Sequence, residues 1–169
     1  ASLGISVDPD VDRLALVNED GEMFGEEYTL VAVADYILQN KKGSAVSNLS
    51  SSMALRDVCE KHQSTYHPSA VGEVNVVAKM KEVNAVIGGE GNGGIIYPEL
   101  HFGRDALVGI ALFLSHLAKT GKSISFLRST YPNYEMIKGK IPLEAQTDVD
   151  GILAKLQAKY SNFEINTVD

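Results

Sequence analysis

Apolar and polar residues follow two different periods along this chain, which predicts strands and helices in turn. Short apolar runs bounded by turn residues predict strands at 3–7, 14–18, 45–49 and 85–87. Apolar residues at helical spacing predict helices at 26–40, 53–62, 75–83, 104–119 and 149–160. The helix over 104–119 is apolar on nearly every side, so we expect it to be the most buried helix.

Strands and helices alternate from residue 26 to about residue 130, which is typical of an α/β domain. We expect a mixed or mostly parallel sheet of about four strands flanked by helices. The predicted domain spans residues 25–142, with a further strand near 136–141. Residues 1–24 predict a β-hairpin left over from a preceding domain. Residues 143–169 then form a linker towards a following domain, so we expect the chain to be an excised piece of a longer protein.

Composition and charge exclude several classes of partner. The chain has 15 basic and 22 acidic residues and no stripe of lysine or arginine, which argues against a nucleic-acid partner. Its longest apolar segment, 106–114, is shorter than the roughly 20 residues needed to span a bilayer, so we expect no membrane association. The one cysteine, Cys59, excludes an internal disulfide and is compatible with a reducing compartment, and we expect a cytoplasmic protein. We expect Cys59 to be a small buried apolar side chain on a helix.

The first candidate site is the loop between the two leading strands. Asp8, Asp10 and Asp12 alternate along this loop, and Arg13 follows at once. Carboxylate oxygens suit Mg²⁺, and the planar guanidinium of arginine suits a phosphate. A solvated acidic turn is one alternative. A calcium-binding EF-hand loop is another, because Glu19 falls at its twelfth position, but Arg13 stands where that loop needs glycine.

The second candidate site is the glycine-rich loop 89–94, Gly-Glu-Gly-Asn-Gly-Gly. It formally satisfies the dinucleotide-binding fingerprint, but that fingerprint requires a helix to begin at its glycines. Residues 95–98 are instead extended and end in proline. We therefore expect the glycines to let the backbone approach a small ligand closely. Glu90 and Asn92 would then form hydrogen bonds with adjacent hydroxyls of a sugar. A polar turn with a solvated Glu90 is the alternative.

The two loops together resemble the α-D-phosphohexomutase family, which includes phosphoglucomutases, phosphomannomutases and phosphoglucosamine mutases. In that family the metal loop usually reads D-G-D-x-D-R, and the sugar loop reads G-E-x-S-G-H or a near variant. The resemblance extends from the first residues to about residue 140. It includes Val71-Gly72 and the segment Phe102-Gly103-Arg104-Asp105.

The resemblance implies a Mg²⁺-dependent enzyme that interconverts hexose 1-phosphates and hexose 6-phosphates through a phosphoserine and a bisphosphorylated intermediate. It implies that Asp8, Asp10 and Asp12 hold Mg²⁺ and that Arg13 contacts phosphate or a neighbouring catalytic group. It also implies that Glu90, with Asn92 in place of the usual serine, orients the sugar of a hexose phosphate. Glu73 falls where relatives carry a histidine or an acid, so it is a candidate general acid/base. The alternative for Glu73 is an ordinary residue in the first turn of a helix.

The departures from the family pattern limit what this chain can do. Gly94 replaces a histidine that many relatives carry, so proton transfer from that position is not available. No serine loop like T-A-S-H-N-P and no phosphate loop like R-x-S-G-T-E-P is present. The resemblance implies a four-domain enzyme, of which this chain covers the end of the second domain and all of the third. Because both loops are missing, we expect no turnover by this chain alone. The rival hypothesis is a non-catalytic module that binds carbohydrates or phosphosugars. The residues leave open the choice among glucose, mannose and glucosamine, and also the oligomeric state.

Overall fold

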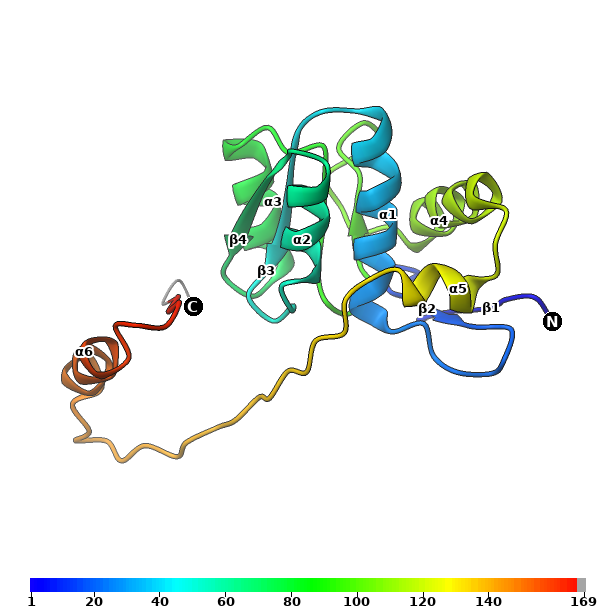
Figure 1. The fold of residues 1–169 in the computed structure, drawn as a ribbon. Coiled ribbons are helices and arrows are strands. Elements are labelled where there is room, and N and C mark those ends of the chain that lie inside the picture. Colours follow the sequence, from blue (N-terminus) through cyan, green and yellow to red (C-terminus); the bar gives the residue numbers. More distant parts are fainter. Residues whose placement is uncertain (167–169) are drawn as a thin grey trace. The chain divides into compact units, whose positions relative to one another are not determined.

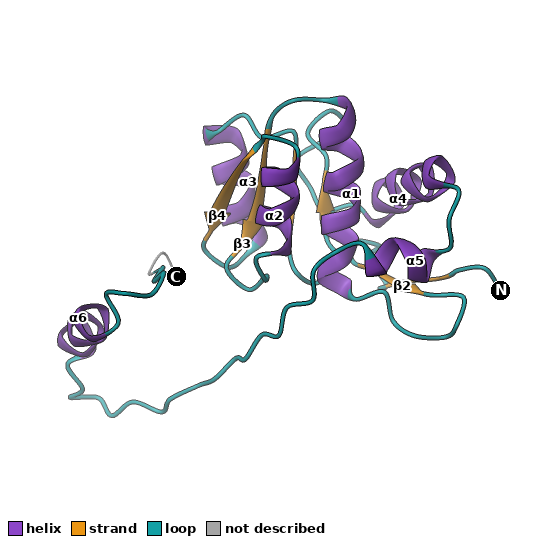
Figure 2. Ribbon diagram, viewed as in Figure 1, coloured by secondary structure: helices purple, strands orange, loops and turns teal. Residues whose placement is uncertain are grey.

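The computed structural model describes residues 1–166 and divides the chain into two compact units, residues 1–135 and the residues from Met136 onwards. Figures 1 and 2 show the elements of each unit. In chain order they are β1 (Gly4–Val7), β2 (Leu14–Val17), α1 (Glu26–Asn40), β3 (Ser44–Asn48), α2 (Ala54–Lys61), β4 (Thr65–Ser69), α3 (Glu73–Glu82), β5 (Ile87–Gly89), β6 (Ile95–Ile96), α4 (Ala106–Thr120), α5 (Ile124–Ser129) and α6 (Val149–Lys159).

The main sheet has four strands in the order β4-β3-β5-β6. β3 pairs in parallel with both β4 and β5, whereas β5 pairs antiparallel with β6. The leading hairpin forms a separate two-stranded antiparallel sheet of β1 and β2. The predicted α/β class, with a mixed four-stranded sheet and an N-terminal hairpin, is therefore confirmed.

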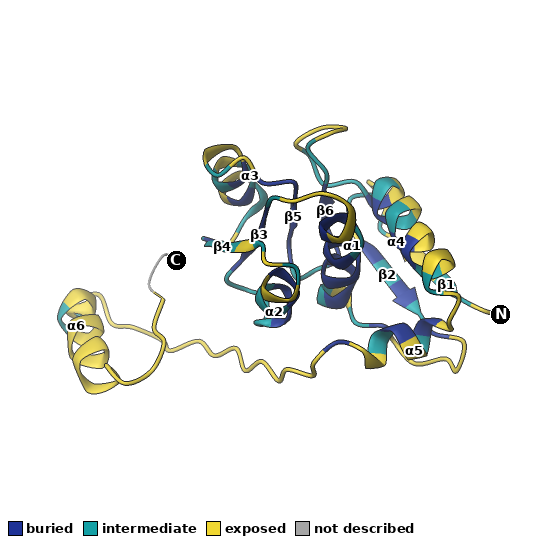
Figure 3. Ribbon diagram, turned by 45° about the horizontal axis from the view of Figure 1, so that its top comes forward, coloured by how far each residue is buried: buried dark blue, intermediate teal, exposed yellow. Residues whose placement is uncertain are grey.

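Helices cover both faces of this sheet, because successive residues along a strand point their side chains to opposite faces. On β3, Ala45 belongs to the larger core, with α1 and α2, while the adjacent Val46 packs with Val76 and Met80 of α3. Figure 3 shows α2 and α3 on opposite sides of the strands. Gly88 of β5 allows α3 to pack closely on the sheet, because an added Cβ would lie 2.4 Å from the sulfur of Met80.

The prediction that the helix at 104–119 would be the most buried is wrong. Ten of the 15 residues of α1 are buried, against four of the 15 in α4. In Figure 3, which is coloured by burial, α1 carries more of the dark blue of buried residues than α4 does. Leu107 of α4 keeps 66% of its surface exposed. An apolar run predicts a helix that can be buried on every side, but the number of neighbours decides the burial, and α4 contacts α1, α5, β2 and β6 along only part of its surface.

The hairpin of residues 1–24 belongs to the same compact unit as the main sheet. Leu14 and Leu16 of β2 are each 1% exposed and lie in the larger core. Phe24 packs edge-to-face on Phe113 of α4, with ring centroids 5.0 Å apart. The hairpin therefore has a definite position against α1 and α4. The domain boundaries at residues 24 and 142 stay predictions.

The N-cap of α4 offers a test of local helix stability. Asp105 Oδ1 accepts a hydrogen bond of 3.0 Å from the amide of Val108, and Oδ2 pairs with His101 at 3.1 Å. We expect Asp105→Ala to lower the free energy of unfolding by about 1 kcal/mol, because the amide loses its acceptor. Asp105→Asn keeps a capping oxygen and is the control. Urea titrations of both variants measure the difference, and equal losses would contradict the capping role.

Two smaller expectations concern the rest of the chain. Cys59 is buried in α2, as expected of a small core side chain, and burial raises the pKa of its thiol to about 12.

The predicted strand at 136–141 is wrong, since residues 132–143 carry no helix or strand. A short segment forms a strand only where another strand can pair with its backbone.

The second unit contains the predicted C-terminal helix, α6, of which no residue is buried. Asp148 caps it by accepting a hydrogen bond of 3.0 Å from the amide of Gly151. Within residues 1–166, no helix has both the length and the apolar character that crossing a bilayer requires.

Candidate functional site

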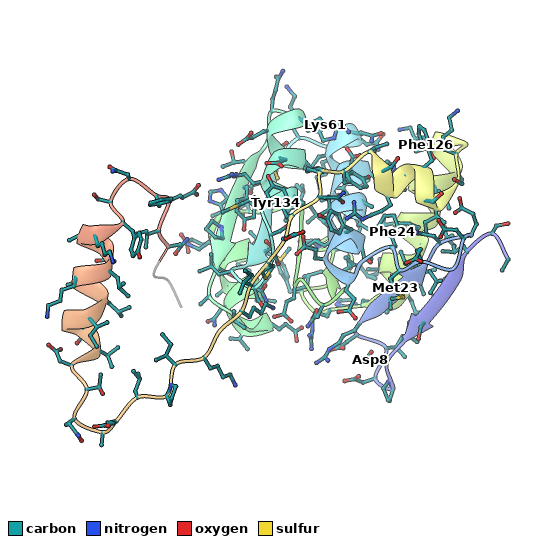
Figure 4. The ribbon with its side chains drawn as sticks, turned by 60° about the horizontal axis from the view of Figure 1, so that its bottom comes forward. Asp8, Met23, Phe24, Lys61, Phe126 and Tyr134 are labelled. Carbon is teal, nitrogen blue, oxygen red and sulfur yellow. The ribbon has the colours of Figure 1, made fainter. Side chains whose placement is uncertain are left out.

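The acidic loop between β1 and β2 folds around the side chain of Asp8. Asp8 Oδ1 accepts hydrogen bonds from the amides of Asp12 (3.1 Å) and Arg13 (3.0 Å), and the bond from Arg13 is the main reason that the pKa of Asp8 is lowered. Val11 adopts a φ of 59°, which is unusual for a β-branched residue. Such local strain is typical of functional loops. Figure 4 shows Asp8 at the end of the hairpin.

The loop brings the three predicted metal ligands together. Oxygen atoms of Asp8, Asp10 and Asp12 lie within 4.8 Å of one another. Asp12 Oδ1 is buried and, among the described residues, accepts no hydrogen bond. Burial, followed by the hydrogen bond with Asp8, raises the pKa of Asp12. Gathered carboxylates that include an unsatisfied oxygen are the donor set that a hard divalent cation requires, so these residues fit Mg²⁺.

Arg13 lies beside the carboxylates but is not enclosed by them. Its Nε is 3.6 Å from Asp8 Oδ2 and 3.7 Å from Asp12 Oδ1, and 56% of its side chain is exposed. A pocket of about 270 Å³ adjoins the loop, lined in part by Asp8, Arg13, Glu26 and Asn92. The accessible guanidinium can therefore contact an anionic group that enters this pocket.

The glycine-rich loop follows β5, at the carboxyl end of the main sheet. The chain runs from β3 outward to β4 and then back past β3 to β5, so the strand order reverses between β3 and β5. Ligands of open α/β sheets bind beyond the carboxyl ends of the strands at such a point. Asn48, the last residue of β3, crosses this point and donates a hydrogen bond of 2.8 Å to Glu90 Oε1.

The two predicted sugar-binding residues have different surroundings. Asn92 lines the pocket, and its Oδ1 accepts a hydrogen bond of 3.1 Å from the amide of Gly94. Glu90 is only 6% exposed and is not among the residues that line this pocket. The predicted sugar contact of both residues stays a prediction. The structure adds Asn48 as a partner that holds Glu90.

Gly93 allows the glycine-rich loop to lie directly on the hairpin. Its φ is +84°, and an added Cβ would stand 2.1 Å from the carbonyl oxygen of Leu14 in β2. Only glycine fits such a contact. The acidic loop, which leads into β2, and the glycine-rich loop are therefore held close together through backbone packing.

Arg104 is the main site residue that we did not predict. Its Nη2 donates to Asp12 Oδ2, its Nη1 donates to Glu90 Oε2 at 2.8 Å, and its Nε lies 3.3 Å from Glu73 Oε2. Glu73 is the first residue of α3, and its Oε1 accepts a hydrogen bond of 3.1 Å from the Arg104 amide. The family resemblance included the segment 102–105 but implied no role for Arg104. Its partners are 14, 31 and 92 residues away, so no local pattern reveals the contacts.

Comparison with known proteins identifies the family. The model of domain III of phosphoglucomutase/phosphomannomutase, an alpha/beta/alpha domain, matches residues 25–134. The chain belongs to this family. The resemblance first drawn from residues 8–13 and 89–94 is thereby confirmed.

Full-length relatives give the same result. The phosphoglucomutase/phosphomannomutase of Thermococcus kodakarensis is 33% identical over 172 residues, which cover all of this chain and 37% of that protein. The phosphoglucosamine mutase of Aliarcobacter butzleri is 31% identical over 168 residues, which cover 94% of this chain and 38% of that protein. The chain thus spans less than two fifths of the length of these relatives.

Solved structures confirm the fold. A phosphoglucomutase/phosphomannomutase family protein from Burkholderia thailandensis matches with a TM-score of 0.70 and 26% identity, covering 79% of this chain and 29% of that one. The N-acetylphosphoglucosamine mutase of Aspergillus fumigatus, solved in complex with GlcNAc-6P and magnesium, matches with a TM-score of 0.65 and covers 92% of this chain and 43% of that one. Its identity of 15% indicates a shared fold alone.

Proposed function

We propose that this chain is the cation-binding and sugar-binding segment of a Mg²⁺-dependent phosphohexomutase, which interconverts hexose 1-phosphates and hexose 6-phosphates. The cluster of Asp8, Asp10 and Asp12, with carboxylate oxygens within 4.8 Å of one another, is the observation that carries the proposal. Membership of the family and the pocket between this cluster and Asn92 support it. The Aspergillus mutase, which was solved with a hexosamine phosphate and magnesium, is consistent with such a ligand pair.

Each group of residues has its own role in this proposal. The three aspartates hold the cation, which when bound would stabilise the negative charge of the transferring phosphoryl group. Arg13, more than half exposed, contacts the phosphate. Asn92 and Glu90 orient the sugar hydroxyls through hydrogen bonds. Catalysis here rests mainly on positioning and electrostatic stabilisation.

Proton transfer falls to Glu73 in this proposal. Arg104 engages both oxygens of Glu73, through its amide at Oε1 and through its Nε, which lies 3.3 Å from Oε2. The carboxylate is therefore held in place, and since 36% of its side chain is exposed, it can accept the proton of the reacting hydroxyl. Position 94 is glycine and cannot take this part. The phosphorylated serine and the clamp for the distal phosphate come from parts of the protein outside this chain.

The same proposal assigns the domains. Residues 1–24 are the end of the second domain and carry the metal loop, residues 25–142 are the third domain, and residues 143–169 lead towards the fourth. We propose a cytoplasmic protein, in keeping with its single buried cysteine.

The function is tested by comparing this chain with the whole protein of which we propose it to be a segment. The whole protein is expected to convert at least one of glucose 1-phosphate, mannose 1-phosphate and glucosamine 1-phosphate to its 6-phosphate when Mg²⁺ is present, and EDTA should abolish turnover. This chain by itself is expected to show none, because the nucleophile is absent. A coupled assay measures both. Turnover by the chain above a blank without protein would contradict the proposal.

Two variants of the whole protein make the assignment specific. Asp10→Asn is expected to lower kcat by at least about 100-fold, because a cation ligand loses its charge. Asp20→Asn changes an exposed aspartate in the turn after β2, so it is the matched control and should keep full activity. Sugar binding without a cation, and unaffected by Asp10→Asn, would instead favour a non-catalytic carbohydrate-binding module.

A further inference from the structure

Arg104 joins three segments that lie far apart in the sequence. Its guanidinium contacts the metal loop at Asp12, the start of α3 at Glu73 and the glycine-rich loop at Glu90. Only 14% of the Arg104 side chain is exposed, and Asp12 and Glu90 are also largely enclosed, at 18% and 7%. Ion pairs enclosed to this degree are screened far less by water than surface pairs.

Arg104 lies among several carboxylates. The two loops and the start of α3 bring together five carboxylates: Asp8, Asp10, Asp12, Glu73 and Glu90. Arg13 and Arg104 are guanidinium groups that pair with these carboxylates. Arg13 is the more exposed of the two and its contacts are longer than 3.5 Å. The close compensation therefore comes from Arg104.

The contacts of Arg104 also select which oxygen atoms remain available. Arg104 engages Asp12 Oδ2, and Asp12 Oδ1 is the oxygen left without a hydrogen bond. On Glu90, Arg104 holds Oε2 while Asn48 holds Oε1, so the carboxylate cannot rotate freely. A guanidinium can do this for two carboxylates at once because its donors are fixed in one plane.

Gly94 makes room for this arrangement. A Cβ added at position 94 would lie 2.5 Å from Cδ of Arg104 and 3.2 Å from Oδ1 of Asn92. The φ of Gly94 lies outside the left-handed region, so alanine is tolerated by the backbone and its main effect falls on Arg104. The stem of Arg104 thus occupies the space that a side chain at position 94 would fill.

We propose that Arg104 is a positioning residue that holds the cation ligand Asp12 and the sugar ligand Glu90 in a fixed relation, and that Gly94 is required because the stem of Arg104 passes over it. This inference rests on the proposed function and deepens it. Arg104 acts through the two carboxylates. The site requires the planar arrangement of its guanidinium donors and not only its positive charge.

The test uses the kinetics of the whole protein, and thermal unfolding checks that each variant is folded. Arg104→Gln is expected to lower kcat/KM by about 100-fold, the size of effect that small misplacements in an active site produce. Arg104→Lys keeps the charge and is expected to recover less than a tenth of the loss, because an ammonium cannot hold both carboxylates in one plane. Lys79→Gln, which affects only an ion pair within α3, is the control and should retain the original kcat/KM.

A cycle with Gly94 distinguishes positioning from a merely structural role. Gly94→Ala is expected to lower kcat/KM in the original protein by about 10-fold or more, yet to have less than a twofold effect when Arg104 is already alanine, because the displaced stem is then gone. Independent, multiplicative losses in this cycle would overturn the proposal, as would full activity of Arg104→Lys. If the original protein has no mutase activity, the proposed function fails and this inference fails with it. If the original protein is active and Arg104→Gln is equally active, only this inference fails.

Discussion

Asp35→Asn is expected to lower the free energy of unfolding by about 3 to 5 kcal/mol, because it removes the charge at the centre of a buried ionic network. Asp35 lies in α1 and is 3% exposed. Its carboxylate accepts hydrogen bonds from Lys61 Nζ at 3.1 Å and from the hydroxyl of Tyr131 at 3.1 Å, and it also pairs with His62 and with His116, the latter at 3.5 Å. The asparagine leaves these partners without a counter-charge.

The same network predicts how stability depends on pH. Burial by itself would raise the pKa of Asp35, but the hydrogen bonds of His116 and His62 and the charge of Lys61 outweigh it and lower the pKa well below the usual 3.8. Since the folded-state pKa is below the unfolded value, Asp35 contributes stability at pH values above about 3.8 and loses it as the pH falls further. Asp35→Asn should lack this acid-dependent part.

Urea titrations of the chain between pH 7 and pH 3 measure both effects. Glu60→Gln is the matched control, since Glu60 is exposed on α2 and pairs with Arg56 only at 3.9 Å. It is expected to cost less than about 0.5 kcal/mol. A loss below about 1 kcal/mol for Asp35→Asn at pH 7 would contradict the structural importance of the network.

Gly93→Ala is expected to destabilise the unit of residues 1–135 by about 3 kcal/mol and to separate the glycine-rich loop from the hairpin. The added methyl group would stand 2.1 Å from the carbonyl oxygen of Leu14, and the φ of +84° is unfavourable for alanine. A backbone atom cannot rotate aside as a side chain can. The two loops must therefore move apart, so in the whole protein mutase activity should fall together with stability.

Gly121→Ala isolates the contribution of the contact. Gly121 ends α4 with a φ of +62°, but an added Cβ there meets no atom within 4 Å. Its expected cost is about 1 kcal/mol, from the backbone conformation alone. Thermal unfolding of the two variants gives the difference. Equal losses would show that the contact between Gly93 and Leu14 is not what holds the loops together.

The local parts of this protein could be predicted because their causes are local. The spacing of Asp8, Asp10 and Asp12 within one turn predicted a carboxylate cluster, and the structure brings these oxygens within 4.8 Å of one another. The helical spacing of apolar residues likewise predicted where α1 and α4 lie along the chain. Their relative burial was not predictable, because burial depends on which elements pack around a helix and not on its own side chains.

The α/β class, the two candidate loops and, through them, the family could all be inferred from the order of the residues. Packing in three dimensions was needed to show that Arg104 and Asn48 hold Glu90, that Gly93 lies directly on β2, and that Asp35 is the centre of a buried network. Hydrogen-bonding turns and helical periods act over a few residues, so the sequence displays them directly. The contacts of Arg104 with Asp12 and of Asp35 with Tyr131 join residues more than 90 positions apart, and they exist only once the sheet and helices have packed.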